Sequence, residues 1–487
     1  MKTAGKLPTI IQGGMGVAVS NWKLARAVSL RGQLGVISGT ALDTVFMRRL
    51  QDGDEGGHMR RAMAQFPLRD AVDDILEKYY LPKGRPKGQP YRLLPMYRQR
   101  VSKQRQLITV IANFVEVYLA KEGHDGIVGI NLLTKVQTPN IASLYGAMLA
   151  GVDYVLMGAG IPREIPGVLD SLALHAAATM RFDVEGVPST EPQYLTFDPS
   201  ELGLDTSVPL RRPAFLPIIS ANSLATTLAR KANGSVEGFI VEGPTAGGHN
   251  APPRGEMRLN ERGEPVYGER DVVDLQKLKE LGLPFWLAGG TGSPTRLADA
   301  LASGAAGIQV GTLFAFSDES GFASFLKRDV LDHASRGEVD VITDPRASPT
   351  GYPFKVVTWA GDESADKPRA RKCDLGYLRL AYRREDGKTD YRCAAEPVED
   401  YVRKGGLEAD TVGRRCLCNA LTANIGQAQP RAGSADEPPL LTSGDDLISI
   451  ASFLAGRDHY TADDVIDYLL EGLTESVGSM TSESATP

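Results

Sequence analysis

Short apolar segments alternate with stretches of helical pattern from residue 8 to about residue 335. The apolar segments contain nearly continuous Val, Ile and Leu without polar alternation, which is typical of strands buried on both faces of a parallel sheet. Eight such strands are predicted, at residues 8–12, 34–38, 127–131, 153–157, 215–219, 238–242, 284–288 and 306–310. Helical stretches separate them, and one of these has clear ends, with Ser293 and Pro294 at its start and Gly304 at its stop.

About eight strand–helix units predict an α/β fold in the form of a (β/α)₈ TIM barrel. A doubly wound open sheet is the alternative that this pattern leaves open. The 487 residues leave room for a barrel of roughly 250 residues together with insertions and a tail.

Three stretches that interrupt the alternation of strands and helices suggest how the chain is divided into domains. Residues 1–340 are expected to form the barrel, with a large insertion at residues 41–125 after the second strand. An extension containing every cysteine follows at residues 341–430, and a C-terminal helical segment at residues 431–475. The Ser- and Thr-rich residues 476–487 are expected to be disordered.

Charge and hydropathy exclude some partners. The formal net charge of −6 argues against nucleic acid as the main partner, because phosphate binding needs a basic surface. No segment approaches the ~20 apolar residues needed to cross a bilayer, so no membrane partner is expected. The first residues also lack the apolar core of a signal peptide, and we expect a cytoplasmic protein.

Glycine-rich loops follow the last two predicted strands, where barrel enzymes place their active sites. The sequence AGGTG occupies residues 288–292 and VGTLF occupies residues 310–314. Glycines there allow the backbone to close on a phosphate group, and free N–H groups supply donors. Loops after the seventh and eighth strands form the usual phosphate site of this fold. The pair of loops therefore predicts a phosphorylated cofactor, in preference to plain turn chemistry.

His249 follows two glycines at the end of the sixth predicted strand. A side chain at that position can project into the mouth of the barrel. Because imidazole titrates near neutrality, it suits proton abstraction. We predict that His249 is the catalytic base, the alternative being a histidine that fixes its own loop by hydrogen bonds.

Five motifs, read together, resemble the nitronate monooxygenase family, formerly called 2-nitropropane dioxygenases. They are QGGMG (12–16), GIN (129–131), AGGH (246–249), AGGTG (288–292) and QVGTLF (309–314). The resemblance implies a flavoprotein that binds FMN and oxidises nitronates or nitroalkanes with O₂ to a carbonyl compound and nitrite. His249 matches the catalytic histidine of that family.

The same resemblance implies which residues contact FMN. The phosphate would lie on the two glycine loops, Asn131 would contact the polar edge of the ring, and the first-strand segment would run beneath it. The implied cofactor-binding residues are Gln12, Gly13, Gly14, Met15, Asn131, Gly247, Gly248, Gly289, Gly290, Gln309, Gly311 and Thr312.

Some features differ from compact nitronate monooxygenases, including NAPPRG after GGH, the insertion and the extension. They are similar to the enoyl-reductase branch of the same superfamily, which implies an alternative function, FMN-dependent reduction of an enoyl thioester on an acyl carrier protein. The basic stretch from Lys83 to Arg105 could then dock the acidic carrier, or could simply be a solvated charged surface. A cofactor-binding subunit without turnover is disfavoured, because such a module needs no base at His249.

All four cysteines, Cys373, Cys393, Cys416 and Cys418, lie in the extension. Four thiolates could hold a structural, tetrahedral Zn²⁺ ion. The Cys-x-Cys spacing is not that of the usual Cys-x-x-Cys knuckles, and free thiols, an iron–sulfur cluster and disulfides stay open. Neighbouring Arg and Lys residues are expected to lower the pKa of the thiols.

Overall fold

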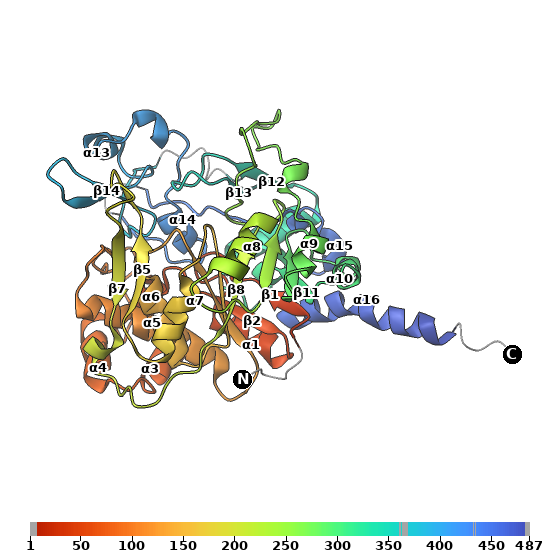
Figure 1. Cartoon of the computed structure of the whole chain (residues 1–487), viewed down its shortest axis with the longest axis horizontal. Helices are drawn as coiled ribbons and strands as arrows, with labels where there is room; N and C mark the ends of the chain where they lie inside the picture. Colours follow the sequence, from red (N-terminus) through yellow and green to blue (C-terminus); the bar gives the residue numbers. More distant parts are fainter. Residues whose placement is uncertain (1–6, 360–361, 363–368, 432, 434, 483–487) are drawn as a thin grey trace.

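Eight parallel strands close into a barrel at the centre of the molecule (Figure 1). The computed structural model describes residues 7–359, 362, 369–431, 433 and 435–482. Around the barrel the strand order is β1-β11-β10-β9-β8-β4-β3-β2. Their bounds are β1 Ile10–Gln12, β2 Leu34–Ser38, β3 Val128–Leu133, β4 Tyr154–Gly158, β8 Ala214–Ile219, β9 Phe239–Glu242, β10 Phe285–Ala288 and β11 Gly307–Val310. The barrel prediction is confirmed, and each of the eight predicted segments overlaps a barrel strand.

Helices surround the barrel and alternate with its strands. They are α1 Trp22–Leu30, α5 Lys103–Lys121, α6 Asn140–Leu149, α7 Ile165–Ala173, α8 Asn222–Lys231, α9 Leu275–Lys279, α10 Pro294–Ala302, α11 Thr312–Ala315 and α12 Ser324–Ser335. Helix α10 begins as predicted, because the Ser293 side chain accepts a hydrogen bond from the N–H of Arg296 and Pro294 fills the first turn. Among the described helices, none is both long and apolar enough to span a bilayer.

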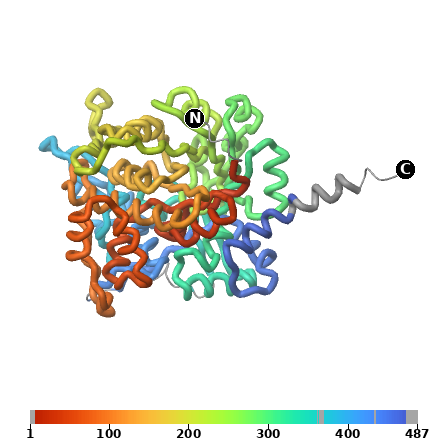
Figure 2. Tube along the Cα trace, turned by 90° about the horizontal axis from the view of Figure 1, so that it is seen from below, coloured from red at the N-terminus to blue at the C-terminus, as the bar shows by residue number. Residues whose placement is uncertain are grey.

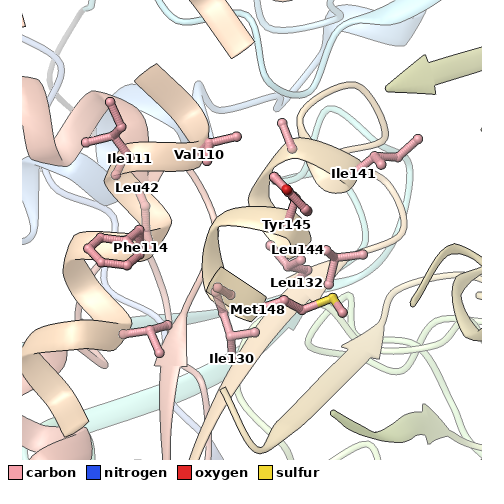
Figure 3. Packing of buried hydrophobic residues seen from close by; sticks show 14 of the residues in the cluster. Leu42, Val110, Ile111, Phe114, Ile130, Leu132, Ile141, Leu144, Tyr145 and Met148 are labelled. Atoms are coloured by element: carbon pink, nitrogen blue, oxygen red, sulfur yellow. The ribbon is translucent and has the colours of Figure 1, made fainter. Parts of the chain in front are cut away.

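The insertion after β2 adds α2 Leu42–Gln51, α3 His58–Met63 and α4 Arg69–Tyr79 before α5. Figure 3 shows how its apolar side chains pack, with Leu42, Ile111 and Phe114 on one side and Leu144 and Met148 on the other. This cluster joins the insertion to the helices outside β3 and β4, so the insertion is part of the core packing.

Three smaller sheets lie outside the barrel. They comprise β5 Ala178–Phe182 with β7 Gln193–Phe197, β12 Val339–Asp344 with β13 Phe354–Trp359, and β6 Val184–Glu185 with β14 Leu380–Arg383 and β15 Thr389–Arg392. The last sheet pairs a strand from the middle of the chain with two strands of the cysteine-containing extension.

The extension folds over one end of the barrel, with β12, β13, β14 and α14 above the strands in Figure 1. The remaining helices are α13 Val398–Arg403, α14 Leu417–Ala423, α15 Ile450–Leu454 and α16 Ala462–Ser482. Short 3₁₀ helices occur at Glu55–Gly57, Pro199–Leu202, Glu269–Asp271, Glu408–Thr411 and Asp445–Leu447.

Helix α16 packs against α1 and α10 (Figures 1 and 2). Helix α16 ends at Ser482. Residues 483–487 lie outside the described residues.

A buried ionic network ties the extension to the insertion. Asp43 in α2 accepts a hydrogen bond from Arg105 in α5 at 2.6 Å and another from the hydroxyl of Tyr377 in the extension. Burial opposes ionisation of Asp43, but the charge of Arg105 and these donated bonds hold the pKa of Asp43 below its usual range. Arg105 was predicted to end a basic docking surface, but its side chain is 3% exposed and paired with Asp43. The structure therefore removes it from that surface.

We expect Asp43→Asn to destabilise the protein strongly, because it leaves the Arg105 guanidinium buried without its counter-charge. The free energy of unfolding, measured by urea denaturation, should fall by about 3–5 kcal/mol. The matched control Asp73→Asn, on the exposed face of α4, should change it by no more than about 0.5 kcal/mol. Equal unfolding midpoints for the two variants would contradict a structural role for the pair.

Candidate active site

A cavity of about 210 Å³ lies at the C-terminal ends of the barrel strands. Its floor comes from the loops after β1, β3, β9, β10 and β11, and its roof comes from the extension and residues 442–446. Much of the wall is apolar, with Val17, Ile218, Phe322 and Leu421 among the lining residues. The extension thus converts the open mouth of a barrel into a covered site.

The structure brings most of the predicted site residues together around this cavity. Those that line it are Gly13, Gly14, Met15, Asn131, Gly247, Gly248, His249, Gly289, Gly290, Gln309, Gly311 and Thr312. They come from five barrel strands or the loops that follow them, which the closure of the barrel brings to one end.

Gln12 is the exception. Its side chain is fully buried away from the cavity; its amide nitrogen donates to Ser20 Oγ at 2.9 Å, and its carbonyl oxygen accepts from the N–H of Val36 at 3.0 Å. These bonds tie the end of β1 to β2 and to the following loop. The expectation that the Gln12 side chain contacts the cofactor is therefore not supported, because its hydrogen-bonding groups are already used.

Two side-chain amides face the cavity with an oxygen left unpaired. Asn131 Nδ2 donates to the carbonyl of Gly14 at 2.9 Å, but Asn131 Oδ1 has no partner among the described residues. Gln309 Oε1 is buried and lacks a partner in the same way. A buried acceptor without a donor costs about 1–3 kcal/mol. Both oxygens are therefore suited to a bound molecule with polar N–H or O–H groups.

The two glycine loops face each other across one end of the cavity. Gly289 and Gly290 have φ angles of +89° and +65°, in the left-handed region that glycine adopts most readily. Thr291 donates to the carbonyl of Gln309 at 2.8 Å, which fixes the first loop against the second. Within the described part of the chain, no group accepts from the N–H of Gly290 or of Thr312. This arrangement of free donors can bind an anion.

Residues 442–446 close the same end of the cavity. The N–H of Gly444 donates to Thr312 Oγ1 at 3.1 Å, and Asp446 accepts from the N–H of Gly292 at 3.1 Å. A Cβ on Gly247 would lie 2.7 Å from the carbonyl carbon of Ser443, so glycine is needed where the segments meet. No local pattern in the sequence marks this segment, because its contacts join residues about 130 to 200 positions apart.

His249 lies between the barrel and the extension. Its backbone forms a β-bridge with Phe354, and the two rings meet edge to face with centroids 4.9 Å apart. Its Nε2 is 2.7 Å from Ser348 Oγ, which fixes the orientation of the ring. Burial lowers the pKa of His249 to about 4, and the positive charge of Lys135 acts in the same direction. The imidazole is therefore neutral near pH 7 and able to accept a proton.

Glu242 is a site residue that the sequence reasoning missed. It ends β9 and lines the cavity, and burial raises its pKa to about 8. At neutral pH it is therefore mainly protonated and can donate a hydrogen bond into the cavity. A carboxyl group at the end of a predicted buried strand, seven residues before His249, was the available signal.

The cysteines of the extension form a neighbouring cluster, and Cys418 also lines the large cavity. Burial raises the pKa of Cys373 to about 11 and raises the pKa values of Cys393, Cys416 and Cys418. The expectation that nearby cations lower these values was wrong, because desolvation outweighs their attraction. In the described chain, no group of three or more His, Cys, Asp or Glu side chains is arranged to hold a single metal ion.

Comparison with known proteins defines the class of this chain as an oxidoreductase enzyme. More specifically, residues 210–344 match the family model described as nitronate monooxygenase. The match begins just before β8, ends with β12, and includes His249 and both glycine loops. It confirms the resemblance predicted from the motifs, and the matched family is one of flavin-dependent enzymes.

Solved structures show a more distant likeness. FabK from Thermotoga maritima is 17% identical with a TM-score of 0.46, covering 98% of this chain and 96% of that chain. Nitroalkane oxidase from Streptomyces ansochromogenes is 17% identical with a TM-score of 0.41, covering 97% of each. The enoyl reductase domain of MlnA from Bacillus amyloliquefaciens is 11% identical with a TM-score of 0.47, covering 98% and 96%. Values this low carry no argument about function. No curated protein matches the chain significantly.

We expect the stability of the cofactor-free protein to depend on Glu242. Because its folded pKa is raised from 4.5 to about 8, the folded state holds a proton that the unfolded state loses, and stability falls as the pH rises through that window. In Glu242→Gln the side chain does not titrate, so its urea midpoint should fall less than that of the wild type between pH 4.5 and about 8.

The exposed Glu256→Gln serves as the matched control and should keep the wild-type dependence on pH. If Glu242→Gln and wild type lose stability equally over the same window, the raised pKa of Glu242 is refuted.

Proposed function

We propose that the protein uses FMN and O₂ to oxidise nitroalkanes or nitronates to a carbonyl compound and nitrite, with His249 as the catalytic base. The observation that carries this proposal is the position of a neutral His249 in the same covered cavity as two glycine loops with free N–H donors. The match of residues 210–344 to the nitronate monooxygenase family supports it.

The cavity has the polar groups that FMN requires. The phosphate would accept hydrogen bonds from the loops at Gly289–Gly290 and Gly311–Thr312, where the donors are free. The unpaired oxygens of Asn131 and Gln309 would accept from N–H or O–H groups of the flavin. When bound, FMN supplies the electron-transfer chemistry with O₂, which no side chain of the protein can provide.

His249 would act on the substrate through its neutral imidazole. Toward a neutral nitroalkane it would remove a carbon-bound proton. Toward a nitronate, which has already lost that proton, it would serve as an N–H donor to the nitro oxygens, because its low pKa disfavours the cation. Ser348 would hold the ring in position, and Phe354 would limit the access of water from the side of the extension.

A second candidate is FMN-dependent reduction of an enoyl thioester carried by an acyl carrier protein. The apolar wall formed by residues such as Val136, Phe322 and Leu421 favours it, because an acyl chain could pack there. Several cations of the basic stretch also remain exposed, namely Lys83, Lys87, Arg92, Arg98, Arg100 and Lys103. They could attract an acidic carrier.

We expect His249→Asn to lower kcat/KM for a neutral nitroalkane by about 10²–10⁴-fold, the usual contribution of a general base. The loss for the pre-formed nitronate should be smaller, because no carbon-bound proton remains to be removed. Nitrite release measures both rates, and flavin absorbance shows that the cofactor is retained. The control Ser348→Ala removes the hydrogen bonds of Ser348 Oγ to the ring and to Thr350 but keeps the imidazole, and it should cost about tenfold or less. Full turnover by His249→Asn with normal FMN content would rule out this role.

The pH profile gives an independent test of the base. For a neutral nitroalkane, kcat/KM should stay level as the pH falls through 6.5, the ordinary pKa of histidine, and should decline only as it nears about 4. A decline centred at 6.5 would show that His249 is not held neutral by burial.

The two candidate functions differ in their need for a reductant. Oxygen uptake and nitrite formation from propionate 3-nitronate without NAD(P)H would support the first function. Consumption of NAD(P)H with crotonyl thioester, without nitrite formation from the nitronate, would support the second and overturn the first.

A further inference from the structure

The four cysteines surround one small cavity beside the large one. Cys373 and Cys393 flank the β14–β15 hairpin, Cys416 caps α14, and Cys418 lies within it. All four line a cavity of about 10 Å³. The fold thus brings all four cysteines of the protein, which come from separate segments of the chain, to the same cavity.

The size of this cavity does not fit a single zinc ion. Four thiolates bind Zn²⁺ at about 2.3 Å, which leaves no room between them for a water-sized sphere. The centre of a water-sized sphere can move through about 10 Å³ of this cavity, so the space is larger than a single water molecule. The described cysteines also include no three that are arranged to hold one ion. The thiols therefore surround a wider space than a mononuclear site, as they would around an iron–sulfur core, in which iron and sulfide separate the thiolates.

Backbone N–H groups are directed at the sulfurs. The backbone N–H groups of Ala395 and Leu378 lie beside Cys393 and Cys418, respectively, where they favour the thiolate form. Cys416 accepts from the backbone and the side chain of a single residue, Asn419, whose Nδ2 is 3.4 Å from the sulfur. Hydrogen bonds to sulfur are the second-shell feature that stabilises and tunes thiolate-bound clusters.

The surroundings also suit a group with net negative charge. Arg379 lines the small cavity, and Arg371, nearby, donates to the carbonyl of Ala394 at 3.1 Å. The acidic residue at the cavity, Glu396, is already paired with Lys404 at 2.8 Å. An iron–sulfur cluster with four thiolate ligands carries negative charge, which these cations would offset.

We propose that Cys373, Cys393, Cys416 and Cys418 bind a [4Fe–4S] cluster. The proposal goes beyond the flavin function and does not rest on it. Cys418 and Leu417 line both cavities, so the cluster would lie in the wall of the flavin cavity, where α14 lies between the rest of the extension and the barrel (Figure 1).

The test is analysis of the full chain, purified without oxygen and then incubated with ferrous iron, sulfide and dithiothreitol. We expect about four iron and four acid-labile sulfide per chain, and a paramagnetic signal after reduction with dithionite. One zinc per chain without sulfide, or neither metal nor sulfide after this treatment, would overturn the proposal. Flavin, released by acid and measured separately, reports on the flavin function alone, so the two proposals can fail independently.

Variants of single ligands complete the test. Cys393→Ser and Cys416→Ser should each lose most of the iron and sulfide, because a cluster needs its full ligand set. The matched control Glu385→Gln, exposed in the turn between β14 and β15, should keep both. Far-ultraviolet circular dichroism confirms folding of each variant. Folded cysteine variants that retain the full iron and sulfide content would refute the assignment.

Discussion

The extension folds over polar groups at the mouth of the barrel and removes them from water. The rest of the structure depends on how the free-energy cost of this desolvation is offset. Burial holds His249 neutral and Glu242 protonated, so both groups avoid carrying an uncompensated charge. The unpaired oxygens of Asn131 and Gln309 cannot reduce the cost in this way. They need a donor, and a flavin in the cavity would provide one.

The extension and residues 442–446 are held over the barrel by contacts between residues that are far apart in the sequence. Tyr377 joins Asp43 and Arg105 in a buried network beneath the extension. Lys355, in β13, pairs with Asp445 at 2.6 Å and fixes the segment that closes the glycine loops. The Asp43–Arg105 pair contributes most because both side chains are buried, so that losing one partner leaves the other charge unsatisfied. The site therefore depends on the extension as much as on the barrel.

The barrel could be predicted because parallel strands buried on both faces have a simple apolar pattern. The glycine loops and His249 could also be found, since barrel enzymes place their chemistry at strand ends. The direction of the Gln12 side chain could not be predicted, because a motif does not reveal which way a side chain points, and here it points into the strand packing. Glu242 and residues 442–446 were missed because their roles arise from burial and long-range contacts. The pKa values of the cysteines were misjudged for the same reason: neighbours in sequence were considered, and desolvation was not.

Equilibrium binding of FMN and riboflavin to the cofactor-free protein tests the central claim most directly. The two ligands share the ring, and only FMN carries the phosphate that the loops at Gly289–Gly290 and Gly311–Thr312 would bind. We predict one FMN per chain, bound at least about tenfold more tightly than riboflavin, since charge-assisted hydrogen bonds contribute about 1.5–3 kcal/mol each. No binding of either ligand, or equal affinity for both, would contradict the account.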